Sequence, residues 1–155
     1  MENKALEGLV IINGRDIWKE YGVFLTEERR GGRENLAAIM APAKTKGHVG
    51  VNIRERDGVK YSQVLSVANE ERDVTLHVAL VAGTRAEWLA RYRAFISFLK
   101  KGDGGWLTVV LPELALSMRM FYVSSSSYKP LTYLWREGLQ ASRFKVTLRE
   151  PEPSF

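Results

Sequence analysis

The middle of the chain has the clearest alternation of apolar and polar residues. Apolar side chains occupy every second position over residues 74–82, and the positions between them include the polar residues Thr75 and His77. Successive side chains of a strand point to opposite faces, so this pattern predicts a half-buried β-strand that ends at Gly83. The same alternation at Phe144, Val146 and Leu148 predicts the last strand of the chain.

One helix is predicted between these strands, from Thr84 to Lys101. It opens with a capping box, in which the Thr84 hydroxyl accepts the amide of Glu87 and the Glu87 carboxylate reaches back. Its apolar side chains form an arc about 120° wide, as in a helix that packs on a sheet. These side chains are Trp88, Leu89, Tyr92, Phe95, Ile96 and Leu99. Phe98 falls outside the arc and indicates a second contact or a partly exposed ring.

A hairpin is predicted at the start of the chain. Asn13-Gly14 separates two apolar-rich runs, Leu9 to Ile12 and Ile17 to Leu25. Asn-Gly readily adopts the positive φ angles of a tight turn, so the pattern indicates a strand, a turn and a strand.

Residues 26–58 show little periodicity. Pro42 and several glycines interrupt the stretch, yet short apolar pieces remain at Leu36 to Met40 and at Val49, Val51 and Ile53. A structureless loop of this length is unusual in a compact domain unless it has a function. We therefore predict one domain over residues 1–155, with an extended arm at about residues 26–60 that finds its packing partner on another chain.

Only strands and turns are predicted after the helix. Apolar residues mark strands at Trp106 to Leu111, Leu116 to Val123 and Leu131 to Trp135, Ser124 to Ser127 are typical of a loop, and Glu137-Gly138 forms a turn. Strands without intervening helices pair through hairpins. The predicted fold class is mainly β (α+β): an antiparallel β-sandwich or barrel with one amphipathic helix packed on it and an extended hairpin arm.

The composition is that of a folded protein with ordinary proportions of hydrophobic (45%) and charged (26%) residues. No apolar run approaches the ~20 residues of a membrane span. The chain has no cysteine, which excludes disulfides, thiolate chemistry and cysteine-based zinc sites. We therefore expect it to fold in the cytoplasm.

The positive charge is concentrated in one segment. Residues 29–60 hold eight basic and three acidic residues, which accounts for the whole net charge of +5. A clustered positive field suits nucleic acid or an acidic protein surface. A solvated loop explains the same pattern, so both interpretations are open.

Catalytic and metal-binding patterns are missing from the sequence. His48 and His77 lack a second ligand at a metal-binding spacing, and no nucleophile motif occurs. Lys101-Gly-Asp-Gly-Gly105 follows a helix, whereas phosphates bind at helix N-termini. Adjacent carboxylates such as Glu27-Glu28 and Glu70-Glu71 indicate solvated charge rather than an acid-base pair. We predict no catalytic activity, no cofactor and no metal.

The layout of several segments along nearly the whole chain is distinctive. These are Ile12-Asn-Gly-Arg-Asp16, Tyr21-Gly-Val-Phe-Leu25, Pro42-Ala-Lys-Thr-Lys46, Val51-Asn-Ile-Arg-Glu-Arg-Asp-Gly58, the strand and helix over residues 72–101, Gly104-Gly-Trp-Leu107, residues 119–123 and Phe144-Lys-Val-Thr-Leu148. Their order resembles the N-terminal domain of siphophage distal tail proteins, a family that shares its fold with tail-tube proteins.

The resemblance implies a non-catalytic structural component of a phage or prophage tail. It implies a β-sandwich flanked by one helix that forms a ring, commonly a hexamer, between the tail tube and the adsorption apparatus. It further implies that DNA passes through the ring without specific binding and that the arm reaches a neighbouring subunit or ring. Other tail proteins are the further partners, and the virion tail, assembled in the bacterial cytoplasm, is the location. Full distal tail proteins usually carry a second domain, so a tail-tube or other ring role stays open.

Seven residues are candidate contacts to other subunits or partners: Lys44, Lys46, Val51, Ile53, Arg54, Arg56 and Phe121. The alternative function is a nucleic-acid-binding β module that uses the basic arm. Arg119, Arg143, Lys145 and Arg149 would point outward from their strands, and phosphate contacts need only such basic groups. Base recognition on a sheet requires exposed aromatic rings, and Phe121 is the one good candidate.

Overall fold

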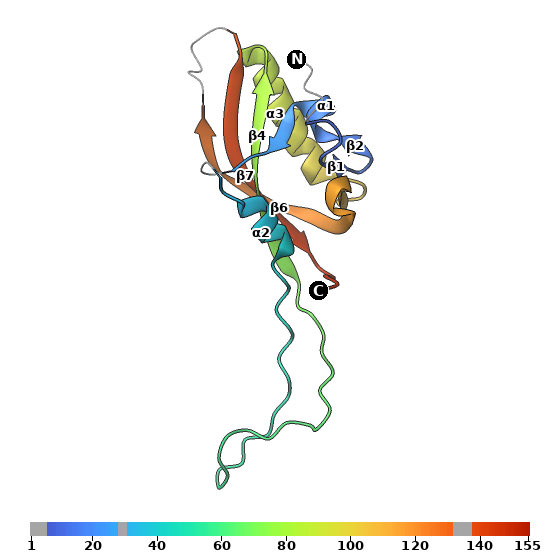
Figure 1. Ribbon diagram of the computed structural model, residues 1–155, viewed down its shortest axis with the longest axis vertical. Coiled ribbons are helices and arrows are strands. Elements are labelled where there is room, and N and C mark those ends of the chain that lie inside the picture. The colour runs from blue at the N-terminus through green and yellow to red at the C-terminus, as the bar shows by residue number, and fades with distance from the viewer. Residues whose placement is uncertain (1–5, 28–30, 132–137) are drawn as a thin grey trace.

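The computed structural model describes residues 6–27, 31–131 and 138–155. In these residues seven strands form one antiparallel sheet in the order β2-β1-β5-β6-β7-β4-β3, and one long segment extends from the body (Figure 1). The strands are β1 (Ile11–Ile12), β2 (Arg15–Asp16), β3 (Val23–Leu25), β4 (Arg72–Ala82), β5 (Leu107–Leu111), β6 (Leu116–Pro130) and β7 (Gln140–Glu150). The helices are α1 (Ile17–Tyr21), α2 (Glu34–Met40), α3 (Arg85–Lys101) and the 3-10 helix η1 (Pro112–Leu114).

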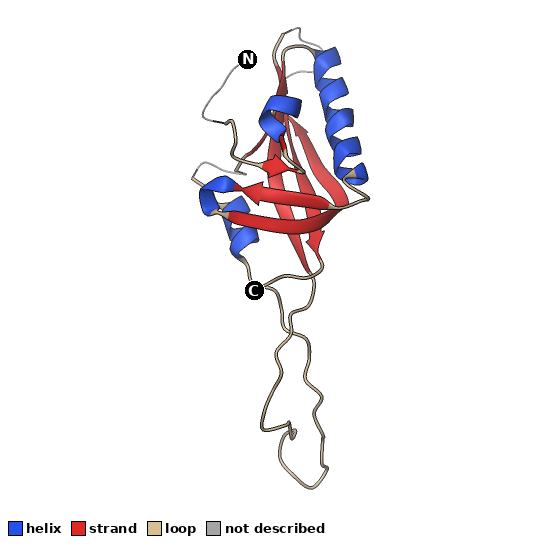
Figure 2. Cartoon of the chain, turned by 90° about the vertical axis from the view of Figure 1, so that its right-hand side faces the viewer, coloured by secondary structure: helices blue, strands red, loops and turns tan. Residues whose placement is uncertain are grey.

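The sheet folds across itself at β6. Residues 116–120 pair with β5, and residues 121–130 pair with β7 through two register shifts. Such irregularities bend and twist a strand. Figure 2 shows β5 and the start of β6 running across the long direction of β4 and β7. One apolar core contains side chains from both halves of the sheet, which confirms the predicted mainly β fold class.

The two strongly alternating strands are neighbours in the sheet, with their buried side chains in register. The paired residues are Val74 with Leu148, Leu76 with Val146 and Val78 with Phe144. Each such aliphatic or aromatic side chain contributes about 1.5–3 kcal/mol when it leaves water. These two predicted strands are confirmed and form the centre of the body.

Helix α3 begins at the predicted capping box. The Glu87 amide donates to the Thr84 hydroxyl at 3.1 Å, and the Glu87 carboxylate accepts from the Gly83 amide at 3.2 Å. The apolar stripe is buried or half-buried except for Leu89, which is 46% exposed because it lies at the edge of the arc. Phe98 makes the second contact, since its ring stacks on Tyr21 with centroids 5.4 Å apart.

The predicted strand from Ile17 to Leu25 is wrong in its first half, which forms α1. The Asp16 carboxylate caps this helix by accepting from the Trp18 amide at 3.0 Å, and Gly22 ends it with a φ of 67°. Five residues are too few for apolar periodicity to separate a helical turn from a strand. Together with α2 and η1, α1 adds short helices to the single one predicted.

The serine run was also predicted incorrectly as a loop. Strand β6 continues through it, with Ser124 opposite Thr147 and Ser126 opposite Lys145. The Ser125 hydroxyl donates to the Lys145 carbonyl at 3.1 Å. Apart from Leu131 and Gly138, the predicted strand from Leu131 to Trp135 and the predicted turn at Glu137-Gly138 fall on residues 132–137, outside the described residues.

Helix α2 belongs to the body, although the sequence predicts that its residues are part of the arm. Asn35 is buried, and its amide nitrogen donates to the carbonyls of Thr26 (2.7 Å) and His77 (3.0 Å) while its oxygen accepts from the His77 amide (2.6 Å). Ile39 is 2% exposed. The extended segment therefore begins after Met40 and ends before β4, and "the arm" below means residues 41–71.

Arg72 joins four parts of the structure where the arm enters β4. Its Nε lies 2.7 Å from the Glu150 carboxylate, in a pair whose side chains are only 8% and 11% exposed. The same guanidinium donates to the carbonyls of Ile39 and Ala41 at the end of α2 and lies 5.3 Å from the centre of the Phe155 ring. One buried cation thus holds β4, β7, α2 and the C-terminal residues together.

The C-terminal residues also hold both limbs of the arm at its root. The Ala43 amide, on the first limb, donates to the Phe155 carbonyl at 3.0 Å. The Asn69 side chain, on the second limb, donates to the Pro153 carbonyl at 3.2 Å. The direction in which the arm leaves the body is therefore set by bonds on both sides.

Replacing Arg72 tests the importance of this junction. We expect Arg72→Met to lower the free energy of unfolding by about 3 kcal/mol, because it leaves the Glu150 carboxylate buried without its cation. Urea titration measures the loss. The matched control is the double variant Arg72→Met, Glu150→Gln, which removes the stranded charge and should recover part of the stability. Equal and small losses in both variants would contradict the assignment.

Candidate assembly interface

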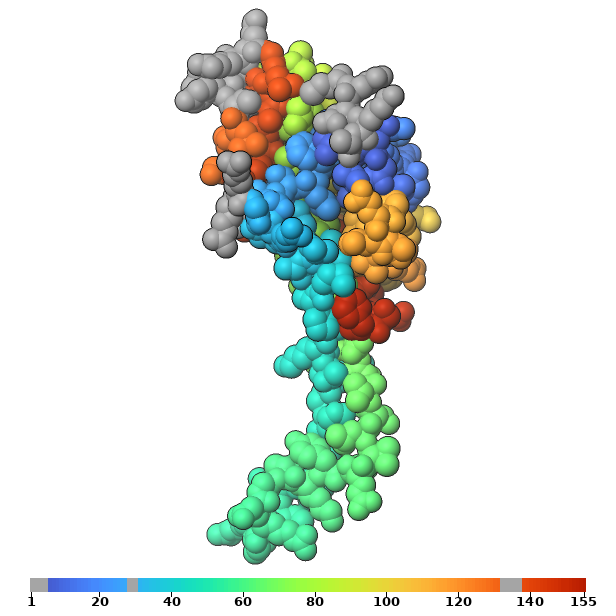
Figure 3. All heavy atoms as spheres, viewed as in Figure 1, coloured from blue at the N-terminus to red at the C-terminus, as the bar shows by residue number. Residues whose placement is uncertain are grey.

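The arm exposes many large apolar side chains. Val49 is 93% exposed and Val64 81% exposed. The others are Val51, Val59, Tyr61, Leu65 and Val67. Figure 3 shows the arm projecting from the body with its two limbs alongside each other and most of its surface open to solvent. Seven exposed apolar side chains on one projecting segment exceed the isolated ones that are normal on a protein surface, and indicate a site of protein interaction.

Few hydrogen bonds join the two limbs of the arm. Near the root, the Lys46 amide donates to the Ala68 carbonyl (2.8 Å) and the Glu70 amide to the Lys44 carbonyl (2.7 Å). Further out, Val51 and Lys60 exchange bonds of 2.8 and 2.9 Å. A two-stranded hairpin without a packed face is marginally stable in water at best. The arm therefore has the properties of a segment that becomes ordered against another surface.

The first limb carries the positive charge of the arm. Over residues 41–54 it holds Lys44, Lys46 and Arg54 and no acidic residue. Residues 55–71 hold four acidic and two basic residues. Only the first limb is thus suited by charge to an acidic surface.

The structure brings six of the seven predicted contact residues together on the arm. Lys44, Lys46, Val51, Arg54 and Arg56 are exposed and Ile53 is half-buried. Phe121 does not join them, because it lies in β6 with its ring edge-on to Trp106, 5.8 Å between centroids. Whether these residues contact a partner stays a prediction.

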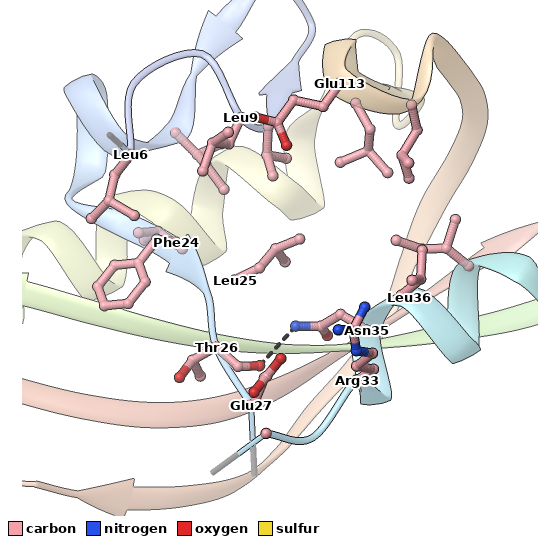
Figure 4. A pocket seen from close by; sticks show the side chains of 17 residues that line it. Leu6, Leu9, Phe24, Leu25, Thr26, Glu27, Arg33, Asn35, Leu36 and Glu113 are labelled. Carbon is pink, nitrogen blue, oxygen red and sulfur yellow. Dashed lines mark hydrogen bonds between the residues drawn. The ribbon is translucent and has the colours of Figure 1, made fainter. Parts of the chain in front are cut away.

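An apolar pocket of about 410 Å³ lies beside the edge strand β3 and was not predicted from the sequence. "The edge pocket" is lined by β3, the N-terminal segment, α2 and η1, as Figure 4 shows. Its aliphatic lining includes Leu6, Leu9, Leu25, Leu36 and Leu114, and its charged lining residues are Glu27, Arg33 and Glu113. With Ile17 of α1, five separate stretches of chain contribute to it, so no local sequence pattern could reveal it.

The outward cations of the sheet make contacts within the chain. The Arg149 guanidinium donates to both carboxylate oxygens of Asp73, at 2.7 and 3.2 Å. The Arg119 guanidinium lies 3.9 Å from the centre of the Trp106 ring. Arg143 donates to the Glu27 carbonyl at 3.1 Å. These contacts give less support to a nucleic-acid-binding face on the sheet than the sequence suggested.

No metal site is found among the residues that the structure describes. No group of three or more His, Asp or Glu side chains there could hold a metal ion. His48 lies on the arm and His77 in β4. No helix in the described part of the chain is both long and apolar enough to cross a membrane.

No protein-family model matches the sequence, and no curated protein matches it. Among solved structures, the chain is similar to the SPP1 Dit (gp 19.1) protein, described as a paradigm of the hub adsorption apparatus in phages that infect Gram-positive bacteria. The TM-score is 0.59 at 11% identity, over 94% of this chain and 50% of the SPP1 protein. The chain thus spans half the length of that protein. The predicted resemblance to distal tail proteins is confirmed in the fold.

Replacing Asp73 tests how charge contributes at the outer face. The hydrogen bond from Arg149 lowers the pKa of the Asp73 carboxyl below its ordinary value. The stability from this pair is therefore present above about pH 4 and is lost as pH falls through the lowered folded-state pKa. We expect Asp73→Asn to lower the urea midpoint slightly at pH 7, because exposed pairs contribute little. The difference in urea midpoint between the variant and the unmodified protein should vanish at acidic pH. A difference that stays constant with pH would contradict a charge effect.

Proposed function

We propose that the chain is a non-catalytic structural component of a phage or prophage tail, which assembles with copies of itself into a ring at the distal tail or tail tube. The fold likeness to a hub protein of a phage adsorption apparatus supports this assignment. The exposed apolar arm is the observation that carries it, because the arm has no packing partner within the body for side chains such as Val49 and Val64.

A ring follows from the kind of contact that the arm can make. The arm and the surface that receives it are different parts of the chain, so the contact is heterologous when each arm reaches the next copy instead of being exchanged within a pair. Heterologous contacts close into rings when the rotation between copies allows it. Six copies is the number that the resemblance to distal tail proteins implies. Other tail proteins above and below the ring, and DNA that passes through it without specific binding, complete the proposed setting.

Association must overcome the loss of freedom of the chains and of the arm. That cost is of the order of 4–15 kcal/mol, and a few well-buried anchors usually supply most of the compensation. The seven exposed apolar side chains of the arm are enough anchors for such a contact. Neighbouring tail proteins that bind the same ring would add further contacts.

A nucleic-acid-binding β module is the second candidate function. The observation that favours it is the first limb, with three cations and no acidic residue over residues 41–54. Contacts to phosphates weaken steeply with salt, because each releases condensed counterions. A strong salt dependence of DNA binding would support this candidate, and the ring proposal predicts weak binding without sequence preference.

The mass in solution tests the ring proposal. Light scattering after size exclusion should give about six chains for the full chain, the number that the resemblance to distal tail proteins implies. Replacing residues 46–68 by Asn-Gly closes the hairpin at the Thr45–Asn69 bridge and should return the mass to that of one shortened chain, below the 17.6 kDa of the full chain.

Substitutions on the arm give a matched test without a deletion. The variant Val49→Ser, Val51→Ser, Val64→Ser should weaken association by at least about tenfold, since each lost buried valine costs on the order of 1 kcal/mol. The control is Leu89→Ser, an exposed leucine on α3 in the body, which should leave the mass unchanged. A full chain that stays monomeric at high concentration would contradict self-assembly.

A further inference from the structure

Strand β3 presents backbone groups at the edge of the sheet that have no hydrogen-bond partner in the part of the chain that the structure describes. It is the last strand in the sheet order, with β4 as its partner. Two hydrogen bonds at the ends of β3 show which of its positions face β4. The Val81 amide donates to the Gly22 carbonyl (3.0 Å), and the Thr26 amide donates to the His77 carbonyl (2.9 Å). Because these positions alternate in an antiparallel ladder, the amides and carbonyls of Val23 and Leu25 face away from β4.

The edge pocket lies directly beside these backbone groups. Val23 and Leu25 themselves line it, together with Leu36 of α2 and Leu114 of η1. Figure 4 shows Leu25, Leu36 and the side chains of the N-terminal segment facing one space. A free strand edge next to an apolar hollow is the arrangement by which proteins bind an extended segment as an added strand. The backbone would supply affinity, and the hollow would take every second side chain.

The first limb of the arm fits this site in pattern and in charge. Val49, Val51 and Ile53 occupy alternate positions of an extended segment, so they would point to one side of an added strand. The limb carries three cations and no acidic residue, and two of the three charged residues lining the pocket are the exposed carboxylates Glu27 and Glu113. Opposite charges across such a contact favour and orient the encounter.

The segment has to come from another molecule. In Figures 1 and 2 the arm of the chain extends away from the body, and its tip lies at the end opposite to α1 and β3. We propose that the edge pocket binds residues 49–53 from the arm of a second copy, which add a strand beside β3. This inference rests on the proposed self-assembly and names the surface that receives the arm.

The absence of cysteine allows a direct test by cross-linking between chains. One chain carries Val51→Cys, a second chain with a longer tag carries Leu36→Cys, and the two are mixed and oxidised. Only a contact between two molecules can form the mixed disulfide. We expect this product to form at least about tenfold faster than with a control chain that carries Ala90→Cys, since docking raises the effective concentration of the two thiols. Ala90 is exposed on α3, and circular dichroism confirms that each variant is folded.

The outcomes separate this inference from the proposed function. Fast coupling to Leu36→Cys and slow coupling to Ala90→Cys supports the edge pocket as the receiving surface. Oligomers in which Val51→Cys couples equally slowly to both chains overturn the inference but leave self-assembly standing. Monomers by light scattering, with only slow background coupling, overturn both.

Discussion

The buried ion pair between Arg72 and Glu150 determines where the body ends and the arm begins. Arg72 opens β4 and Glu150 closes β7, so the pair lies at the shared end of the two central strands. A buried charge is tolerated only with its partner and with its remaining hydrogen bonds satisfied. The guanidinium meets that requirement by also binding carbonyls at the end of α2, which a helix leaves without internal donors. The positions of α2, the arm root and the C-terminal residues therefore depend on one side chain.

The two parts of the chain that meet at this junction differ in how far they bury their apolar side chains. The body encloses its apolar side chains between the two halves of a folded sheet and needs no partner for its core. The arm has the reverse character, with exposed valines and few bonds between its limbs. Ordering an isolated hairpin costs conformational entropy, and the small apolar area that it buries does not offset this cost. Docking against a second surface adds both apolar burial and backbone hydrogen bonds. This contrast is the physical reason for proposing self-assembly through the arm, in a chain that shares its fold with the SPP1 Dit protein.

The parts of the fold that the sequence predicted are those that local pattern controls. Strands β4 and β7 and helix α3 have long, regular apolar spacing, and Thr84 and Glu87 mark the helix start. Helix α1 was missed because it has five residues, although Asp16 and Gly22 are its cap signals. The serines of β6 were misread because pairing to β7, not their own propensity, holds them in the sheet. The arm was predicted from its lack of pattern, but its boundary at Met40 depends on Asn35 bonding to distant strands. The edge pocket depends on residues brought together only by the tertiary fold.

Hydrogen exchange of the full chain at low and at high protein concentration tests directly whether assembly orders the arm, because it reports on each segment separately. We expect the amides of residues 47–67 to exchange rapidly in the dilute protein and at least about tenfold more slowly in the concentrated one, while β4 and β7 are equally protected in both. The amides of Val23 and Leu25 should slow together with the arm. An arm that exchanges at the rate of an unstructured peptide in fully assembled protein would contradict the claim that assembly orders it.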